Sequence, residues 1–158
     1  MLLSIAATMT LTGWSERTVW RRFAGHIVKN GTSNRRSMIP FEVIEPHLCL
    51  ALAPEDLPAL EQADAGDADS QHALALLFLS KDKPEGAIDW LEHAAKHDHA
   101  DAMNLLGICS IEGNGRPKDE TLGIAWIAKG AALGHVISQR QMEFIHDRSE
   151  KLKNIASR

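Results

Sequence analysis

Apolar residues recur at helical spacing through most of the chain after residue 65. Residues three and four positions apart on a helix lie on the same face, so an apolar stripe of this period predicts a helix with one buried side. The two clearest stripes comprise Ala73, Leu74, Leu77 and Phe78, and Leu105, Leu106 and Cys109. Each is bounded by a polar, turn-forming stretch. The pattern therefore predicts a series of short amphipathic helices.

The helices predicted in this region come as a repeated pair. Segments 66–71, 98–103 and 134–139 each open an apolar helical pattern, and segments 88–95 and 124–131 share a tryptophan among small residues. Trp90 and Trp126 are 36 residues apart, as are His99 and His135, whereas Asp67 and His99 are 32 apart. The turn of the second hairpin, at 111–119, is longer, and this accounts for the difference of four residues between the two spacings. Two helices per unit at this period predict an α-solenoid of about two hairpins, closed by a capping helix from 136 to about 155.

Small residues and turn residues agree with this repeat. Small side chains allow neighbouring helices to approach closely, and they recur at Ala87, Ala94, Ala95, Gly107, Gly123, Gly130 and Ala131. In the turn at 80–84, Pro84 can open the second helix of the first hairpin, because proline is tolerated in the first helical turn. We expect the turn at 113–117, with Pro117, to do the same in the second hairpin. One unit cannot bury its own apolar face, so the units must stack.

Three motifs of the second unit resemble the Sel-1-like repeat family. They are Ala100-x-Ala102-x-x-x-Leu106-Gly107, Gly113-x-Gly115-x-Pro117-x-Asp119, and Gly123-x-x-Trp126-x-x-x-Gly130-Ala131. The first unit matches less fully, since its turn lacks the Gly-x-Gly element. The resemblance covers about residues 66 to 145. It implies a tetratricopeptide-like superhelix that acts as an adaptor or scaffold and has no substrate.

The first 25 residues predict two short helices joined by a tight turn. Ser4 can cap a helix that ends near Met9, with Ile5, Ala6 and Met9 turned inward, and a turn follows at 12–14 around Gly13. Ser15 can cap a second helix at 16–24 by meeting free amides near Thr18. We expect that helix to bury Val19, Trp20 and Phe23 and to project Arg17, Thr18 and Arg21 outward, flanked by Arg22. This arrangement is typical of a helix-turn-helix.

The next residues predict a small β-hairpin, or wing. Segments 26–29 and 37–39 have the composition of short strands, and the polar turn at 30–34 begins with Asn30-Gly31. Pro40 then starts a short helix at 41–44. The run Ser4-Ile5, Thr12-Gly13-Trp14-Ser15-x-Arg17-Thr18-Val19-x-Arg21 is similar to the winged helices of the MerR and excisionase-like families, over about residues 2 to 45. The resemblance implies that the second helix enters the major groove and the wing contacts the DNA backbone. Trp14 departs from the pattern, because these families usually carry a smaller apolar residue there.

Charge separates the two parts of the chain. The 158 residues carry a net charge of -4, yet residues 1–45 hold six basic and three acidic side chains. The remaining 11 basic and 18 acidic residues lie beyond. A basic N-terminal part and an acidic remainder suggest different partners, and binding to a polyanion is plausible for the first part alone.

The basic residues of the N-terminal part are candidates for contact with double-stranded DNA. Arg17 and Arg21 are the best candidates for base edges, because a guanidinium matches guanine in the major groove. The residues expected to hold phosphates are Ser15, Thr18, Arg22, Lys29, Asn34, Arg35 and Arg36. Two isolated arginines would indicate only a solvated helix face; six basic residues on a helix-turn-helix and wing favour DNA. A single copy with so few contacts would bind weakly, so a homodimer is expected.

Residues 47–65 connect the two parts. Segment 47–52 is apolar, Pro54 begins a helix, and Leu57, Leu60 and Ala63 continue its buried face. We expect this segment to pack on the first repeat and to couple the two parts rigidly. The predicted organisation is thus mainly α-helical: a winged helix-turn-helix at 1–46, a connecting helical segment at 47–65, and a repeat domain at 66–158.

Other chemistry has little support in the sequence. His93 and His97 are four residues apart and His99 is near, but no third ligand or general base accompanies them, so we predict no metal site. Cys49 and Cys109 are predicted to be free thiols in a reducing cytoplasm. With no catalytic triad, no phosphate-binding loop, no signal peptide and no apolar run of roughly 18 residues, we expect no enzyme activity, no cofactor and no membrane span.

Two functions of different classes remain open. The first is a bacterial DNA-binding transcriptional regulator whose repeats dimerise or bind a partner protein. The second is a cytoplasmic adaptor, of a chaperone-like or immunity type, in which the basic N-terminal part only completes the fold.

Overall fold

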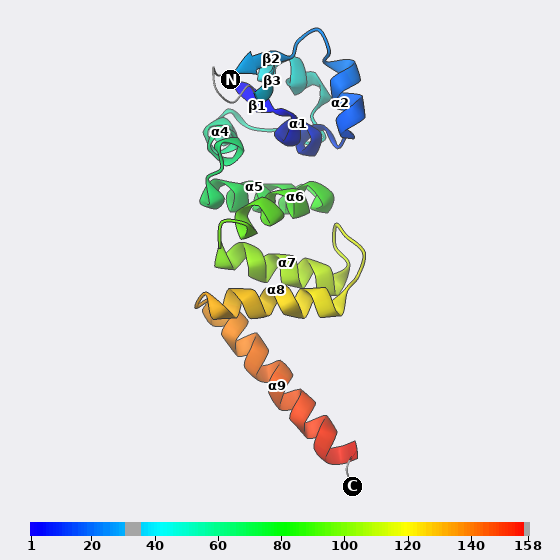
Figure 1. The fold of residues 1–158 in the computed structure, drawn as a ribbon, viewed down its shortest axis with the longest axis vertical. Helices are drawn as coiled ribbons and strands as arrows, with labels where there is room; N and C mark the ends of the chain where they lie inside the picture. Colours follow the sequence, from blue (N-terminus) through cyan, green and yellow to red (C-terminus); the bar gives the residue numbers. More distant parts are fainter. Residues whose placement is uncertain (31–35, 157–158) are drawn as a thin grey trace.

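The computed structural model describes residues 1–30 and 36–156, which form an elongated stack of helical layers (Figure 1). The small N-terminal unit lies at one end and the helical hairpins follow it in sequence order. The last helix projects from the opposite end. The structure confirms the prediction that the chain is mainly helical and contains a small sheet.

The N-terminal unit contains a three-stranded sheet. β2 (Val28–Asn30) and β3 (Arg36–Pro40) pair antiparallel, as predicted, with Val28 opposite Met38. A further strand, β1 (Leu2–Ser4), pairs with the other edge of β3 and places Leu3 opposite Ile39. The sequence predicted only the two-stranded hairpin. β1 ties the first residues of the chain to the wing and completes the buried side of the unit.

Two capped helices follow β1, as predicted. α1 (Ile5–Thr12) begins at Ser4, whose Oγ accepts the Ala7 amide at 3.1 Å, and ends at Gly13 in the left-handed conformation. α2 (Glu16–Arg22) begins at Ser15. The predicted inward face of α1 was partly wrong. The helix continues to Thr12 and buries Ala7, Thr8 and Leu11, so Ala6 is exposed and Met9 half-buried.

The connecting residues fold as predicted. α3 (Phe41–Ile44) and the 3-10 turn η1 (Glu45–His47) close the N-terminal unit. η2 (Pro54–Asp56) leads into α4 (Leu57–Ala65), which buries Leu60 and Ala63 and packs on the next helix. The division of the chain at residues 46 and 65 remains a prediction, because one buried core runs across both boundaries.

Two helical hairpins form the stack. α5 (Ala68–Ser80) pairs with α6 (Pro84–Ala95), and α7 (Ala100–Glu112) with α8 (Glu120–Ala132). Pro84 opens α6 as predicted, but α8 begins three residues after Pro117 and is capped by Asp119, whose carboxylate accepts the Leu122 amide at 2.9 Å. α9 (Val136–Ala156) packs its first turns on α8 and then leaves the stack (Figure 1).

Some predicted core positions are only partly buried. Leu74 and Phe78 are fully enclosed, whereas Ala73 is exposed because it lies on the far side of α5. Trp90 is buried, but its counterpart Trp126 is half-buried and the Lys129 ammonium lies 4.3 Å from its ring centroid. The two helices have different neighbours: α1 of the N-terminal unit packs on α6, whereas α9 packs on α8.

Two histidines begin helices at equivalent repeat positions. The Nδ1 atoms of His99 and His135 accept the amides of Ala102 and Ser138, each at 3.2 Å. A neutral ring whose Nδ1 accepts must carry its proton on Nε2. That atom lies 3.1 Å from Asp69 for His99 and 3.0 Å from Asp101 for His135. Each histidine therefore caps its own helix and also bonds to the first turn of the preceding repeat.

Acid is expected to weaken this junction through His72. The His72 ring stacks on His99 with centroids 4.7 Å apart. Burial, followed by repulsion from His99 when that ring is protonated, lowers the pKa of His72. The folded state therefore binds fewer protons than the unfolded state, so the free energy of unfolding should fall as the pH drops below 6.5, the ordinary value. Urea denaturation across this range should show a shallower loss for His72→Gln, while the exposed His146→Gln should follow the wild type. Identical pH dependence in all three proteins would contradict the assignment.

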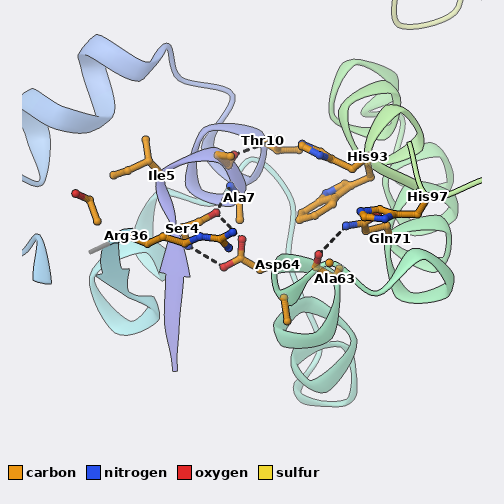
Figure 2. Close-up of a pocket in the computed structure, with 15 residues that line it drawn as sticks. Ser4, Ile5, Ala7, Thr10, Arg36, Ala63, Asp64, Gln71, His93 and His97 are labelled. Carbon is orange, nitrogen blue, oxygen red and sulfur yellow. Dashed lines mark hydrogen bonds between the residues drawn. The ribbon is translucent and has the colours of Figure 1, made fainter. Parts of the chain in front are cut away.

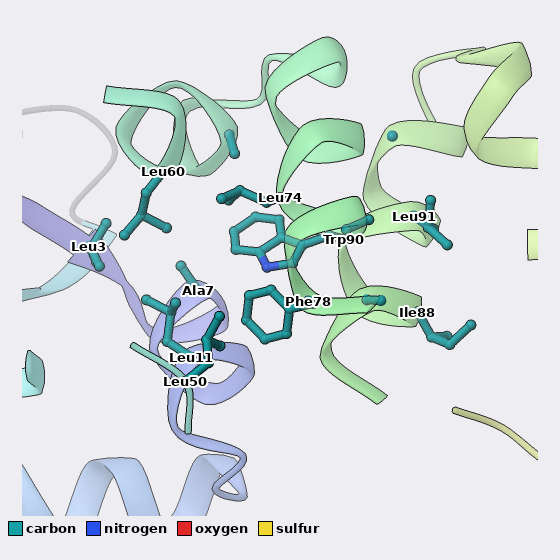
Figure 3. Close-up of a cluster of buried hydrophobic side chains, with 14 of the residues drawn as sticks. Leu3, Ala7, Leu11, Leu50, Leu60, Leu74, Phe78, Ile88, Trp90 and Leu91 are labelled. Atoms are coloured by element: carbon teal, nitrogen blue, oxygen red, sulfur yellow. The ribbon is translucent and has the colours of Figure 1, made fainter. Parts of the chain in front are cut away.

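The N-terminal unit and the first hairpin share a hydrophobic core (Figure 3). Leu3 and Leu11 from the unit meet Leu60, Phe78 and Trp90 from the helices that follow. Hydrogen bonds reinforce this contact: the Ser4 amide donates to Asp64 at 2.8 Å, and the Thr10 hydroxyl donates to Asp89 at 3.0 Å. The connecting segment thus contacts both the N-terminal unit and the first hairpin, and the rigidity of this coupling stays a prediction.

Candidate nucleic-acid interface

The second helix of the N-terminal unit presents basic side chains to solvent. Val19 and Phe23 are buried beneath α2, one helical turn apart, and fix which face of the helix is covered. Arg17, Arg21 and Arg22 are consequently all exposed. The two arginines predicted to contact base edges are four residues apart and lie on one outward face.

Two hydroxyls define the start of α2. Ser15 Oγ accepts the Thr18 amide at 3.4 Å and lies 3.0 Å from Thr18 Oγ1. The predicted capping role of Ser15 is confirmed. Helix N-termini carry partial positive charge and free amides, and the pair of hydroxyls stands at the end where a phosphate would be favoured. Their contact with phosphate remains a prediction.

Trp20 belongs to this surface, contrary to the sequence prediction that it is buried. Its side chain is 38% exposed, and its Nε1–H donates to Glu16 Oε1 at 3.3 Å. Lys29 on β2 places its ammonium 6.0 Å from the centroid of the indole ring and donates to Ser37 at 2.8 Å. The spacing of the residues could have shown this. Val19 is the buried residue of the seven-residue helix and Phe23, at its C-cap, continues the same face, which leaves Trp20 with Glu16 on an adjacent face.

The contacts of Trp14 explain why a large residue occupies the turn between α1 and α2. Its ring lies 5.8 Å from that of Phe23 and 5.1 Å from that of His47, measured between centroids. The Arg22 guanidinium carbon lies over this ring, 4.8 Å from its centroid. Arg22 is therefore held against the turn by a cation–π contact, and a phosphate would have to be reached from that position.

The structure places the basic residues of the wing in two different surroundings. Lys29 lies beside α2, whereas Arg36, on β3, extends toward Ser4 and Asp64 along the wall of a cleft (Figure 2). Asn34 and Arg35 lie outside the described residues. The structure thus brings together Ser15, Arg17, Thr18, Arg21, Arg22 and Lys29, and it separates Arg36 from them.

The remaining candidate groups have other surroundings. His93 and His97 line the same cleft as Arg36, while His99 caps α7. Within residues 1–30 and 36–156, no three histidine, cysteine or acidic side chains are grouped closely enough to hold a metal ion. Cys49 and Cys109 are free thiols, as predicted, and burial raises the pKa of each. No helix in the described part of the chain combines the length and the apolar character needed to cross a membrane.

Comparison with known proteins supports the repeat fold. No protein-family model matches the chain, and a search of curated proteins finds no match. Among solved structures, the chain is similar to the crystal structure of a Sel1 repeat protein from Oxalobacter formigenes, with a TM-score of 0.56 and 28% sequence identity. The match covers 61% of this chain and 76% of that one. The predicted resemblance to Sel-1-like repeats is therefore supported by a solved structure, whereas that of residues 2–45 to MerR and excisionase-like winged helices stays a prediction.

Proposed function

We propose that this protein is a DNA-binding transcriptional regulator. In this proposal α2 enters the major groove, with Arg17 and Arg21 at base edges, and the helical repeats dimerise or bind a partner protein. The observation that carries the proposal is the exposure of both arginines on the outer face of α2, the second of two short capped helices that a β-hairpin follows. A guanidinium in that position has the reach and donor geometry for guanine.

Several contacts beside the arginines support this role. The Ser15 and Thr18 hydroxyls stand at the N-terminal end of α2, and Lys29 joins the wing to the exposed ring of Trp20. A surface of this kind combines charge for phosphates with fixed side chains for positioning. The acidic balance of the rest of the chain would keep the repeats away from DNA and leave them to protein contacts.

The proposal predicts a salt-dependent loss of DNA binding in Arg17→Ala/Arg21→Ala. Each lost base contact should weaken binding by at least about 1 kcal/mol, so the loss of two should weaken the affinity of the double variant roughly thirtyfold or more. The measurement is fluorescence anisotropy with sheared genomic DNA across a series of salt concentrations. Arg140→Ala/Arg148→Ala removes the same charge from exposed positions of α9 and is the matched control.

The result also separates this function from a role as a protein adaptor without DNA binding. The regulator is supported if the DNA affinity of the wild type falls as the salt concentration rises, and if only the α2 variant binds DNA more weakly than the wild type. Equal affinity in both double variants, or no salt-dependent binding by the wild type, contradicts it. Circular dichroism of each variant shows whether the fold is retained.

A further inference from the structure

A cleft of about 560 Å³ lies where the N-terminal unit meets the first hairpin (Figure 2). One wall comes from the start of α1, from β3 and from the end of α4, and the opposite wall comes from α5 and α6. This volume falls within the range of small-molecule sites, which lie preferentially between structural units. The candidate DNA-contacting face of α2 contributes no residue to this lining.

Two deeply buried side chains of the lining hold polar atoms that have no partner among the described residues. They are the side-chain oxygen of Gln71, which is 4% exposed, and the indole N–H of Trp90, which is 3% exposed. Gln71 Nε2 donates to the Ala63 carbonyl at 2.9 Å, which fixes the orientation of the amide. A buried polar atom without a partner costs about 1–3 kcal/mol. Both atoms are covered by neighbouring side chains, so a molecule that offers one acceptor and one donor would satisfy them once these side chains at the wall of the cleft move aside.

Charged groups of both signs accompany these atoms. Asp64 lies at the wall with its carboxylate turned toward Ser4, and Arg36 extends from β3 toward the same place (Figure 2). His93 and His97 lie on the opposite wall. A carboxylate accepts up to four hydrogen bonds, and Asp64 receives two from Ser4, so it has capacity for a further donor.

We propose that this cleft binds a small zwitterion with one carboxylate and one ammonium, the chemistry of a free amino acid. The ligand carboxylate accepts from the Trp90 indole and faces Arg36, and the ammonium donates to Gln71 and Asp64. Because Ile5, Ala7 and Ala63 add an apolar part to the lining, an aliphatic side chain fits. Such a ligand would bridge the N-terminal unit and the repeats. The proposal needs no DNA binding, and its test contains no DNA.

The test follows the indole N–H signal of Trp90 by nuclear magnetic resonance while L-leucine is added to the full chain. Trp90→Phe identifies the signal among the four tryptophans. Isocaproate, which is leucine without the amine, and isoamylamine, which is leucine without the carboxylate, are the matched probes. We expect a saturable shift with leucine and at least tenfold weaker binding of either fragment.

Variants place the binding in the cleft. Arg36→Gln removes an exposed charge with little risk to the fold and should weaken leucine binding about tenfold, as loss of a hydrogen bond to a charged group does. Arg140→Gln is its control and should bind as the wild type does. Gln71→Met should also weaken leucine binding. If this variant fails to fold, the result for Arg36→Gln alone tests whether leucine binds in the cleft.

Three outcomes would overturn the proposal. The first is the absence of a saturable shift with any probe, which would mean that no ligand reaches the indole N–H. The second is equal binding of isocaproate and leucine, which would indicate a site for simple anions. The third is unchanged leucine binding in Arg36→Gln, which would place the ligand elsewhere.

Discussion

Gly107→Ala is expected to lower the free energy of unfolding by about 2–3 kcal/mol, as overpacking a tight helix contact does. Helix propensity alone predicts the opposite sign, because alanine is favoured over glycine inside a helix by about 1 kcal/mol. The deciding observation is the space: a Cβ at Gly107 would lie 2.5 Å from the Ile127 side chain and 2.8 Å from the Gly123 carbonyl oxygen. A backbone atom cannot move aside without separating α7 from α8.

The same contact can be tested from the other helix. A Cβ at Gly123 would lie 2.6 Å from the Gly107 carbonyl oxygen, so Gly123→Ala should destabilise the protein similarly. Gly25→Ala is the control, since nothing lies within 4 Å of the added atom. Urea denaturation followed by circular dichroism gives the three free energies. Stabilisation by Gly107→Ala, as propensity alone requires, would show that the helices do not approach this closely.

Phe78→Ala is expected to cost about 3–5 kcal/mol, the range for removing a fully buried aromatic ring. The ring lies between α1 and α6, beside Leu11 and Trp90 (Figure 3). The absence of a side chain at Gly86 leaves room for the Phe78 ring, because a Cβ added at Gly86 would lie 2.3 Å from it. The variant should therefore weaken the first hairpin and the N-terminal unit together.

The measurement is urea denaturation monitored by tryptophan fluorescence and circular dichroism. Leu76→Ala on the same helix is the control; Leu76 is 47% exposed, and its truncation should cost much less. Coincident transitions by both probes in wild type and variant would agree with a shared core. A small effect of Phe78→Ala, equal to that of Leu76→Ala, would contradict the packing described here.

The candidate nucleic-acid surface could be predicted in part. Ser15 caps α2, and the outward projection of Arg17 and Arg21 follows from helical spacing once Val19 is buried. The exposure of Trp20 was missed because a large aromatic residue usually signals a core. Within the seven-residue helix only Val19 is buried, and the packing of the rest of the unit decides that Phe23, at the C-cap, continues this stripe in place of Trp20.

The sequence by itself determined the features that depend on residues close together in the chain. Helical periodicity, the caps at Ser4 and Ser15, the turn at Gly13 and the repeated pair of helices all arise from contacts within a few residues, or from a motif that recurs. The small residues that permit close helix packing were also visible. Their role at Gly107 and Gly123 follows from the stacking that a solenoid requires.

Only the tertiary structure decided the features that join distant residues. β1 pairs with β3, more than thirty residues later, Ser4 bonds to Asp64, and the histidine caps reach the preceding repeat. No local pattern encodes such pairings, because each depends on which surfaces the packed helices bring together. The cleft between the N-terminal unit and the first hairpin has the same origin. Its lining comes from six elements that only the shared core places side by side.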